Sequence, residues 1–279
     1  MHTRHLLFFV ILCFLPILGF AHGKKIAKVV IDAGHGGHDG GAHGQFSQEK
    51  NLTLAIALRV GRIMADSMKD VQVIYTRTSD IYPTLVERHE IANRAKADLF
   101  ISIHINSTAD RIERIAAGTR TVGKGKHKRH VTVYKTIRHH ETSTRGTETY
   151  VLGLHRNSQK EEAIGEYGDS VTEEAGMLNE NDPQTAIIVA QYSQAFLTRS
   201  LSLGSKIQAE FSAQSRPDFG VKQKGLEVLA GSAMPGVLVE CGFINNASEE
   251  AYMNSEDGQN EIAMAIYRGI KNYKLEVER

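Results

Sequence analysis

The sequence predicts an α/β fold, and three observations support this prediction. Apolar segments rich in β-branched residues alternate with amphipathic segments of helical period from residue 25 onward. The links between the first of these segments are short, so we expect parallel strands with right-handed crossovers. The chain has 279 residues, of which 41% are hydrophobic and 23% charged, as in a folded globular protein with a substantial core.

The first residues are predicted to lie outside this domain. Residues 1–4 form a short basic start, residues 6–20 form an apolar run, and residues 19–21 offer small side chains at cleavage-site spacing. This pattern predicts a secretory signal peptide over residues 1–21 and a domain over residues 22–279. An uncleaved N-terminal anchor is the alternative, although the apolar run is short for a membrane span.

Cleavage after residue 21 would remove Arg4 and Cys13. It leaves 32 basic residues (33 less Arg4) against 32 acidic ones, so net charge gives no argument for binding nucleic acid. Cys241 becomes the one remaining cysteine, which excludes an intramolecular disulfide. We therefore expect an exported protein of the periplasm or cell envelope, with no membrane span after cleavage.

The first half of the domain alternates strands with helices. Its segments are a strand at 25–33, a helix at 49–68, a strand at 71–76, a helix at about 84–97 and a strand at 98–105. Thr84 and Glu87 form a capping-box pattern at the start of the second helix.

Residues 108–146 interrupt the alternation with a basic insertion. It carries ten lysines and arginines against three acidic residues, and four histidines add charge if the pH falls. Residues 131–134 could form a hairpin strand, but a mobile solvated loop is an equally good interpretation, since charge-rich runs are usually solvated. Clustered basic residues could also grip anionic wall or lipid polymers.

The alternation resumes after the insertion. The predicted segments are a strand at 147–153, an acidic loop or short helix at 156–183, a long helix at 186–211, strands at 221–229 and 237–241, and a helix at 261–273. Pro183 stands where a helix can begin.

Polar side chains recur where apolar strands end. His35 follows the first strand in a glycine-rich stretch, His104 lies near the end of the third strand, and Glu240 follows an apolar run. Glu49 opens the first helix, which leaves the same sheet edge. Because open parallel sheets bind ligands beyond the carboxyl ends of their strands, we expect these four residues to converge. A dinucleotide-binding loop does not fit, because its third glycine would fall at Asp39.

Two imidazoles and a carboxylate match a catalytic zinc site with a fourth position open to water. A second carboxylate, not bound to the metal, could take a proton from water and pass it to a leaving nitrogen. His38 and His43 compete with His35 as ligands, and spacing does not choose between them. Taken singly, each histidine could serve in a turn, and Glu49 could be a charge at a helix start.

Several stretches carry a resemblance to a known family. They are residues 31–37, 49–52, 75–77, 87–88, 92–93, 102–106, 146–150 and 235–246. In this order they resemble the zinc-dependent N-acetylmuramoyl-L-alanine amidases, from about residue 26 to 274, interrupted by the basic insertion. The resemblance implies a single domain with a mixed, mostly parallel sheet flanked by helices on both faces.

The resemblance also implies roles by position. One Zn²⁺ per chain would be bound by His35, Glu49 and His104, with Glu240 as the catalytic carboxylate. The reaction would be hydrolysis of the amide between N-acetylmuramic acid and L-alanine of peptidoglycan, in cell-wall remodelling and daughter-cell separation.

Other polar residues of these stretches are expected to support the site. Arg77 and Arg88 match recurrent family positions, for which we expect an ion-paired scaffold role. Asp32 is expected to bind the second ring nitrogen of a ligand, and His38 and Asp39 to lie at the rim or behind the ligands.

In the cell-division branch of that family, a segment in this part of the chain covers the site until an activator protein moves it. Residues 154–182 occupy the corresponding place here. We hypothesise that Glu161, Glu162 or Glu166 reaches the open zinc position in a resting state; an ordinary acidic surface loop is the alternative.

Two other functions fit the same residues. A zinc peptidase cutting within stem peptides would use identical metal chemistry, and a non-catalytic wall-binding module could activate other hydrolases. The products of a peptidoglycan digest distinguish the three: free stem peptides, shortened stems, or no products.

Overall fold

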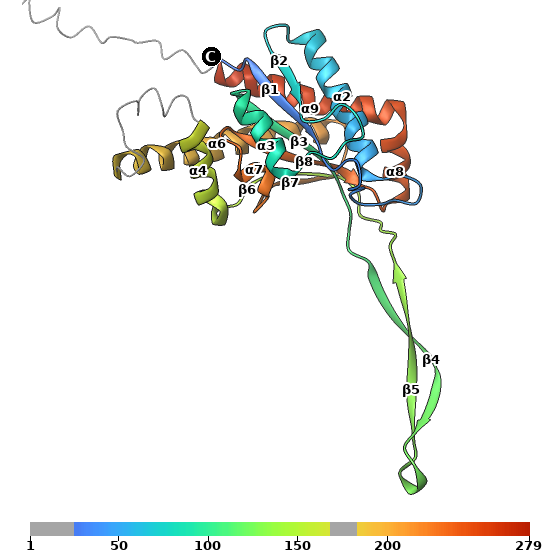
Figure 1. Cartoon of the computed structure of the whole chain (residues 1–279). Helices are drawn as coiled ribbons and strands as arrows, with labels where there is room; N and C mark the ends of the chain where they lie inside the picture. Colours follow the sequence, from blue (N-terminus) through green and yellow to red (C-terminus); the bar gives the residue numbers. More distant parts are fainter. Residues whose placement is uncertain (1–24, 168–182) are drawn as a thin grey trace, which may run out of the picture.

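A six-stranded mixed sheet forms the centre of the fold, with strand order β2-β1-β3-β8-β6-β7 (Figure 1). The structure is a computed structural model, and it describes residues 25–167 and 183–279. The predicted signal peptide lies outside the described residues, as do residues 168–182 of the predicted regulatory segment.

Four neighbouring strands run in one direction and two run in the other. β1 pairs in parallel with β2 and β3, and β3 with β8, whereas β6 is antiparallel to β8 and parallel to β7. This confirms the α/β class and the parallel crossovers predicted for the first three strands. The strands are β1 (Lys28–Ala33), β2 (Gln72–Tyr75), β3 (Leu99–Asn106), β6 (Thr147–Leu152), β7 (Asp218–Lys224) and β8 (Gly236–Phe243).

Helices cover the two faces of the sheet unequally. The described helices are α2 (Glu49–Ser67), α3 (Leu85–Arg94), α4 (Asn157–Tyr167), α6 (Pro183–Ala213), α7 (Glu227–Ala230), α8 (Ala247–Asn254) and α9 (Glu256–Val277). The long helices α2, α6 and α9 pack on one face, in the larger core. The short helices α3 and α7 contribute to the smaller core on the other face.

The two cores follow the alternation of the strands. In β3, Ile101 and Ile103 belong to the larger core and Phe100 to the smaller one. In β8, Val239 belongs to the larger core and Leu238 to the smaller one. His104 and Glu240 therefore share the face covered by the short helices, because side chains two residues apart in a strand lie on one face. A strand face that is only partly covered can present polar groups to a substrate.

The sequence prediction was wrong or incomplete at three places. Residues 221–229 were expected as one strand, but β7 ends at Lys224 and residues 227–230 form α7. Helix α8 was not predicted. The basic insertion forms a regular antiparallel ribbon of β4 (Arg111–Val122) and β5 (Arg129–His139), joined by the short helix η1 (Gly125–His127). The strand expected at 131–134 lies within β5.

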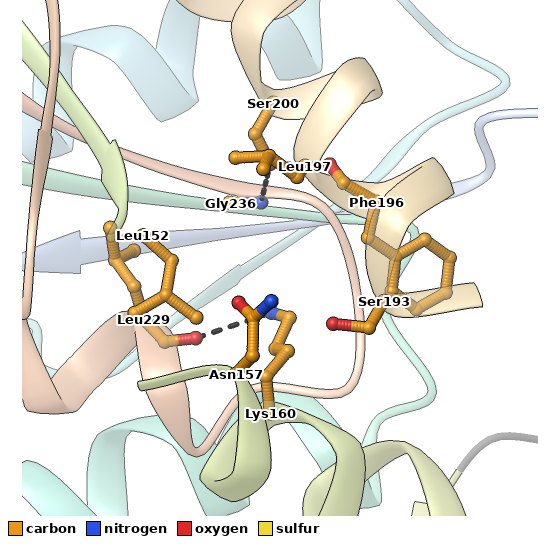
Figure 2. Close-up of a pocket in the computed structure, with 9 residues that line it drawn as sticks. All are labelled: Leu152, Asn157, Lys160, Ser193, Phe196, Leu197, Ser200, Leu229 and Gly236. Atoms are coloured by element: carbon orange, nitrogen blue, oxygen red, sulfur yellow. Dashed lines mark hydrogen bonds between the residues drawn. The ribbon is translucent and has the colours of Figure 1, made fainter. Parts of the chain in front are cut away.

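Helix α4 is fastened to the turn that precedes β8 by one buried lysine. The ammonium of Lys160 donates to the carbonyl oxygens of Leu229 (3.2 Å) and Met234 (2.7 Å) and to the hydroxyl of Ser232 (2.9 Å). Figure 2 shows this side chain beside a small pocket whose lining includes Ser193 of α6. Burial lowers the pKa of Lys160 to about 7, because the buried ammonium loses its hydration.

Replacing Lys160 with methionine should reveal how much free energy of folding is lost by burying its charge. The pKa is about 7 in the folded chain and about 10.4 in an unfolded one. Between these values the unfolded chain binds the extra proton, so raising the pH favours folding. The free energy of unfolding of the wild type relative to Lys160→Met should therefore rise by more than about 1 kcal/mol between pH 7 and pH 10. Urea denaturation at three pH values measures it. Lys271→Met, at an exposed position, is the control, and parallel pH curves for wild type and Lys160→Met would contradict the assignment.

Candidate metal centre

Three side chains predicted to bind a metal lie together at the carboxyl ends of β1 and β3. His35 follows β1, His104 lies in β3 and Glu49 is the first residue of α2. One potential ligand atom from each of the three lies within 4.8 Å of the other two. Of the competing histidines, His38 packs against Tyr82 with ring centroids 4.3 Å apart, and neither His38 nor His43 belongs to this cluster.

The carboxylate of Glu49 sits between the two imidazoles. Its Oε2 lies 3.1 Å from Nε2 of His35, and its Oε1 lies 2.9 Å from Nδ1 of His104. The backbone amides of Ala42 and Ile105 donate to the same two oxygens at 2.8 and 2.9 Å. These four contacts fix the orientation of the Glu49 side chain, which is only 5% exposed.

The electrostatics of this cluster call for a positive charge at its centre. Burial alone would raise the pKa of Glu49, but hydrogen bonds from His104 and His35 hold it well below its usual range. Burial alone would lower the pKa of His35, but Glu49 first and Asp39 second raise it to about 9. A divalent cation can supply the same positive charge in exchange for protons. Two imidazoles and one carboxylate are also the donor set of a catalytic zinc site with one open position.

Asp39 orients the first candidate ligand. Its Oδ2 lies 2.8 Å from Nδ1 of His35, which leaves Nε2 of His35 directed at Glu49. We expected Asp32 in a role of this kind, and this expectation was wrong. The carboxylate of Asp32 instead binds Arg88 and accepts a hydrogen bond from the hydroxyl of its register partner Ser102 at 2.6 Å.

Two buried arginines hold the backbone that leads to His35. Arg88 forms an ion pair with Asp32 at 2.7 Å and donates to the carbonyl oxygens of Ala33 and His35, both at 2.7 Å. Arg77 donates to the carbonyl oxygens of Ala33 (2.9 Å) and Gly34 (2.8 Å). His35 has a φ of +59°, which is strained for a residue with a side chain and persists only when its surroundings enforce it. The arginines supply that constraint.

Glycines leave room for the candidate ligands. A Cβ atom on Gly34 would lie 2.4 Å from the ring of His104. A Cβ atom on Gly41 would lie 2.6 Å from Oε2 of Glu49 and 2.7 Å from the ring of His35, and this glycine also has a φ of +64°. These two positions therefore require glycine because the imidazoles and the carboxylate approach the backbone closely.

A second carboxylate lies beside the cluster. Glu240 of β8 is the register partner of His104 on one side and of Glu148 in β6 on the other, so the three side chains form a row across the sheet. Oε2 of Glu240 is buried and has no hydrogen-bond partner among the described residues. Burial raises the pKa of Glu240 to about 7, and the charge of His104 offsets this only in part. This carboxyl group can therefore gain or lose a proton near neutral pH.

Glu148 is a member of this row that was not predicted from the sequence. Its Oε1 accepts hydrogen bonds from Asn106 and from the hydroxyl of Tyr150, both at 2.6 Å, and Lys222 pairs with its Oε2. These partners lower the pKa of Glu148, so it stays ionised beside Glu240. Glu148 could have been singled out because it is a carboxylate within a predicted strand, which is the same signal that pointed to Glu240.

The structure does not bring Glu161, Glu162 and Glu166 to the metal cluster. β6 runs antiparallel to β8, so the chain leaves β6 at the end of the sheet opposite to His104 and Glu240. Helix α4 then packs against the turn before β8, where Lys160 is bound. Glu162 and Glu166 line a cleft with His89 of α3. In this structure, these three glutamates therefore give no support to the hypothesis that one of them reaches the open zinc position.

The fold and the site together define a class of protein. A mixed α/β sheet that presents two histidines, a carboxylate and a nearby protonatable glutamate has the apparatus of a metal-dependent hydrolase. The family model described as N-acetylmuramoyl-L-alanine amidase matches residues 29–272, and the chain belongs to this family. This confirms the resemblance recognised in the sequence.

Individual relatives support the same assignment. N-acetylmuramoyl-L-alanine amidase AmiA of Escherichia coli is 30% identical over 256 residues, which cover 90% of this chain and 76% of that protein. The crystal structure of N-acetylmuramoyl-L-alanine amidase from Clostridium difficile matches with a TM-score of 0.59 at 26% identity, covering 90% of this chain and 97% of that one. The catalytic domain of CwlV from Paenibacillus polymyxa matches with a TM-score of 0.57 at 28% identity, covering 90% and 98%.

Replacing Arg88 with methionine should destabilise the chain by roughly 3–5 kcal/mol, because the charge of Asp32 would remain buried without its partner. Urea denaturation measures the loss. Arg94→Met on the same helix removes only an exposed pair with Glu90 and should cost less than about 1 kcal/mol. Equal losses for the two variants would contradict a structural role of the buried pair.

Replacing Gly34 with alanine should displace the ring of His104 and weaken zinc binding by about 10- to 100-fold, the usual cost of disturbing a ligand's support. Competition with a chromophoric chelator measures the affinity, and circular dichroism verifies the fold. Gly165→Ala in α4, where an added Cβ meets open space, is the matched control. Unchanged affinity in a folded Gly34→Ala protein would argue against His104 as a ligand.

Proposed function

We propose that the chain is a zinc-dependent N-acetylmuramoyl-L-alanine amidase that binds one Zn²⁺ through His35, Glu49 and His104. Its reaction is hydrolysis of the amide between N-acetylmuramic acid and L-alanine in peptidoglycan, with release of stem peptides. The observation that carries the proposal is the convergence of these three side chains beside the unpartnered carboxyl of Glu240, in a chain of this family.

Zinc bound at such a site acts as a Lewis acid for the scissile carbonyl and makes water more acidic. We assign the proton transfer to Glu240, which is the register partner of His104. Its free Oε2 can accept the proton of the attacking water, and the carboxylic acid so formed can donate it to the leaving nitrogen. A pKa of about 7 suits both steps, because a group that must accept and then donate works best near the working pH.

Glu148, the neighbour of Glu240 in the row across the sheet, has a supporting role in this reaction. Glu148 stays ionised through Lys222, Tyr150 and Asn106, and its negative charge contributes to the raised pKa of Glu240. It thereby favours the protonated form of Glu240, which is the form that donates to the leaving group. We assign Glu148 as a positioning residue, since it acts through its neighbour.

The proposed location is outside the cytoplasmic membrane, where peptidoglycan lies. The predicted signal peptide at residues 1–21 supports export. Within residues 25–167 and 183–279, no helix is both long enough and apolar enough to cross a bilayer.

A digest of purified sacculi by the zinc-loaded protein tests the reaction. Mass spectrometry should detect stem peptides with free L-alanine amino termini. Shortened stems would instead identify a peptidase, and the absence of products would favour a wall-binding module. Chelation of the metal should abolish release, and added Zn²⁺ should restore it, because the Lewis acid is required.

Two variants separate metal binding from proton transfer. Glu240→Gln should keep one Zn²⁺ per chain and lose about 10²- to 10⁴-fold in turnover, the usual contribution of a general acid–base group. His104→Ala should lose the metal itself, as elemental analysis would show. Glu256→Gln, whose side chain is 80% exposed at the start of α9, is the control. Full turnover in Glu240→Gln would exclude it as the proton carrier.

A further inference from the structure

The basic insertion projects from the domain as a long two-stranded arm (Figure 1). We define the arm as residues 111–139, which comprise β4, η1 and β5. The two strands pair with each other from Arg111 and His139 at the root to Val122 and Arg129 near the tip. Most of the arm's side chains are exposed, including the apolar ones of Ile112 and Tyr134, each 52% accessible. A segment with this much open surface contributes little to the core, which suggests a role in binding.

Positive charge is concentrated on this arm. The arm contains nine lysines and arginines against one acidic residue, Glu113, which lies 2.8 Å from His139. The remainder of the chain has 24 basic residues (33 less these 9) against 31 acidic ones (32 less Glu113). Clustering of one sign of charge raises the local potential and attracts a partner of the opposite sign. The arm therefore fits a polyanion, while the body of the protein does not.

The tip of the arm favours a hydrated polyanion over insertion into a lipid bilayer. Residues 123–130 have the sequence Gly-Lys-Gly-Lys-His-Lys-Arg-His, with no apolar side chain. An element that enters a membrane interface presents aromatic or aliphatic side chains there. The exposed aliphatic side chains of the arm lie nearer its root and middle, at Ile112, Ile115 and Val133.

The root of the arm is bound to the loop that carries the first candidate ligand. His140, just beyond β5, has Nδ1 2.8 Å from Asp110 and Nε2 2.8 Å from the carbonyl oxygen of His43. Asn245 donates to the carbonyl oxygen of His140 at 2.7 Å. At the other side of the root, β4 begins five residues after β3, the strand that contains His104. A polymer held by the arm would therefore run toward the metal centre.

We propose that the arm binds the carboxylate-bearing peptidoglycan polymer while one of its amide bonds occupies the metal centre. This inference rests on the proposed function, since it assigns the arm's ligand to the same polymer. Peptide stems repeat along a glycan strand and carry carboxylates, so several weak ion contacts act together on one polymer. Contacts of this kind raise the effective concentration of substrate at the site without any change in the catalytic groups.

Pelleting with intact sacculi tests the binding. The full chain in the Glu240→Gln background is used, so that the polymer is not degraded. Lys124→Gln, Lys126→Gln, Lys128→Gln and Arg129→Gln together should weaken binding about tenfold, as the loss of four exposed ion contacts would give. Wild-type binding should also fall between 0.1 and 0.5 M salt, because exposed charges are screened. The matched control removes three lysines and one arginine at exposed positions of the body, namely Lys25, Lys69, Lys271 and Arg268.

A second readout uses the active chain with two substrates. The arm variant should hydrolyse a soluble muramoyl-peptide monomer at the wild-type rate and sacculi more slowly, because only the polymer reaches the arm. Equal binding of sacculi by arm and control variants would overturn the proposal. So would stronger binding to phosphatidylglycerol vesicles than to sacculi, which would assign the arm to a lipid surface. Absence of hydrolysis of both substrates would refute the proposed reaction, whereas the pelleting result would still decide the role of the arm.

Discussion

The buried ion pair between Asp32 and Arg88 is the interaction on which the site depends. Both side chains are almost fully buried, and the hydroxyls of Thr76 and Ser102 complete the hydrogen bonds of Asp32. Hydrogen bonds to the charged form, together with Arg88, keep the pKa of Asp32 low despite its burial. The same guanidinium also binds the carbonyl oxygen of His35. The pair therefore links a buried residue of β1 to the loop that holds His35 in the metal centre.

The site arranges its charges so that neighbouring carboxylates have different protonation states. Glu49 has imidazole and amide donors, and Glu148 has a lysine, a tyrosine and an asparagine. Glu240 lies close to both carboxylates and has no hydrogen-bond partner for its Oε2 among the described residues. Burial, together with the charges of Glu49 and Glu148, raises the pKa of Glu240 to about 7. Among these three carboxyl groups it is therefore the one that can exchange a proton near neutral pH, which amide hydrolysis beside a metal ion requires.

Local patterns predicted much of this structure, and long-range pairings account for what they missed. His35, His104 and Glu240 were predicted to converge because each follows or ends an apolar run, and parallel strands bring such ends together. Asp32 was misplaced because Arg88 and the hydroxyls of Thr76 and Ser102 bind its carboxylate. The turn at Gly36 instead brings Asp39 back to His35. The direction of β6 cannot be derived from its sequence. The expected mixed sheet did not say which strand is reversed, so nothing indicated that α4 begins at the far end of the sheet.

The arm joins two strands that are not neighbours, since β8 lies between β3 and β6 in the sheet. Its first and last residues, Arg111 and His139, are register partners, so their Cα atoms lie about 5 Å apart. A turn of a few residues could close that gap without moving either strand. The insertion is thus a module in the architectural sense, since its length and charge can change through evolution or engineering while the catalytic sheet keeps the same connections.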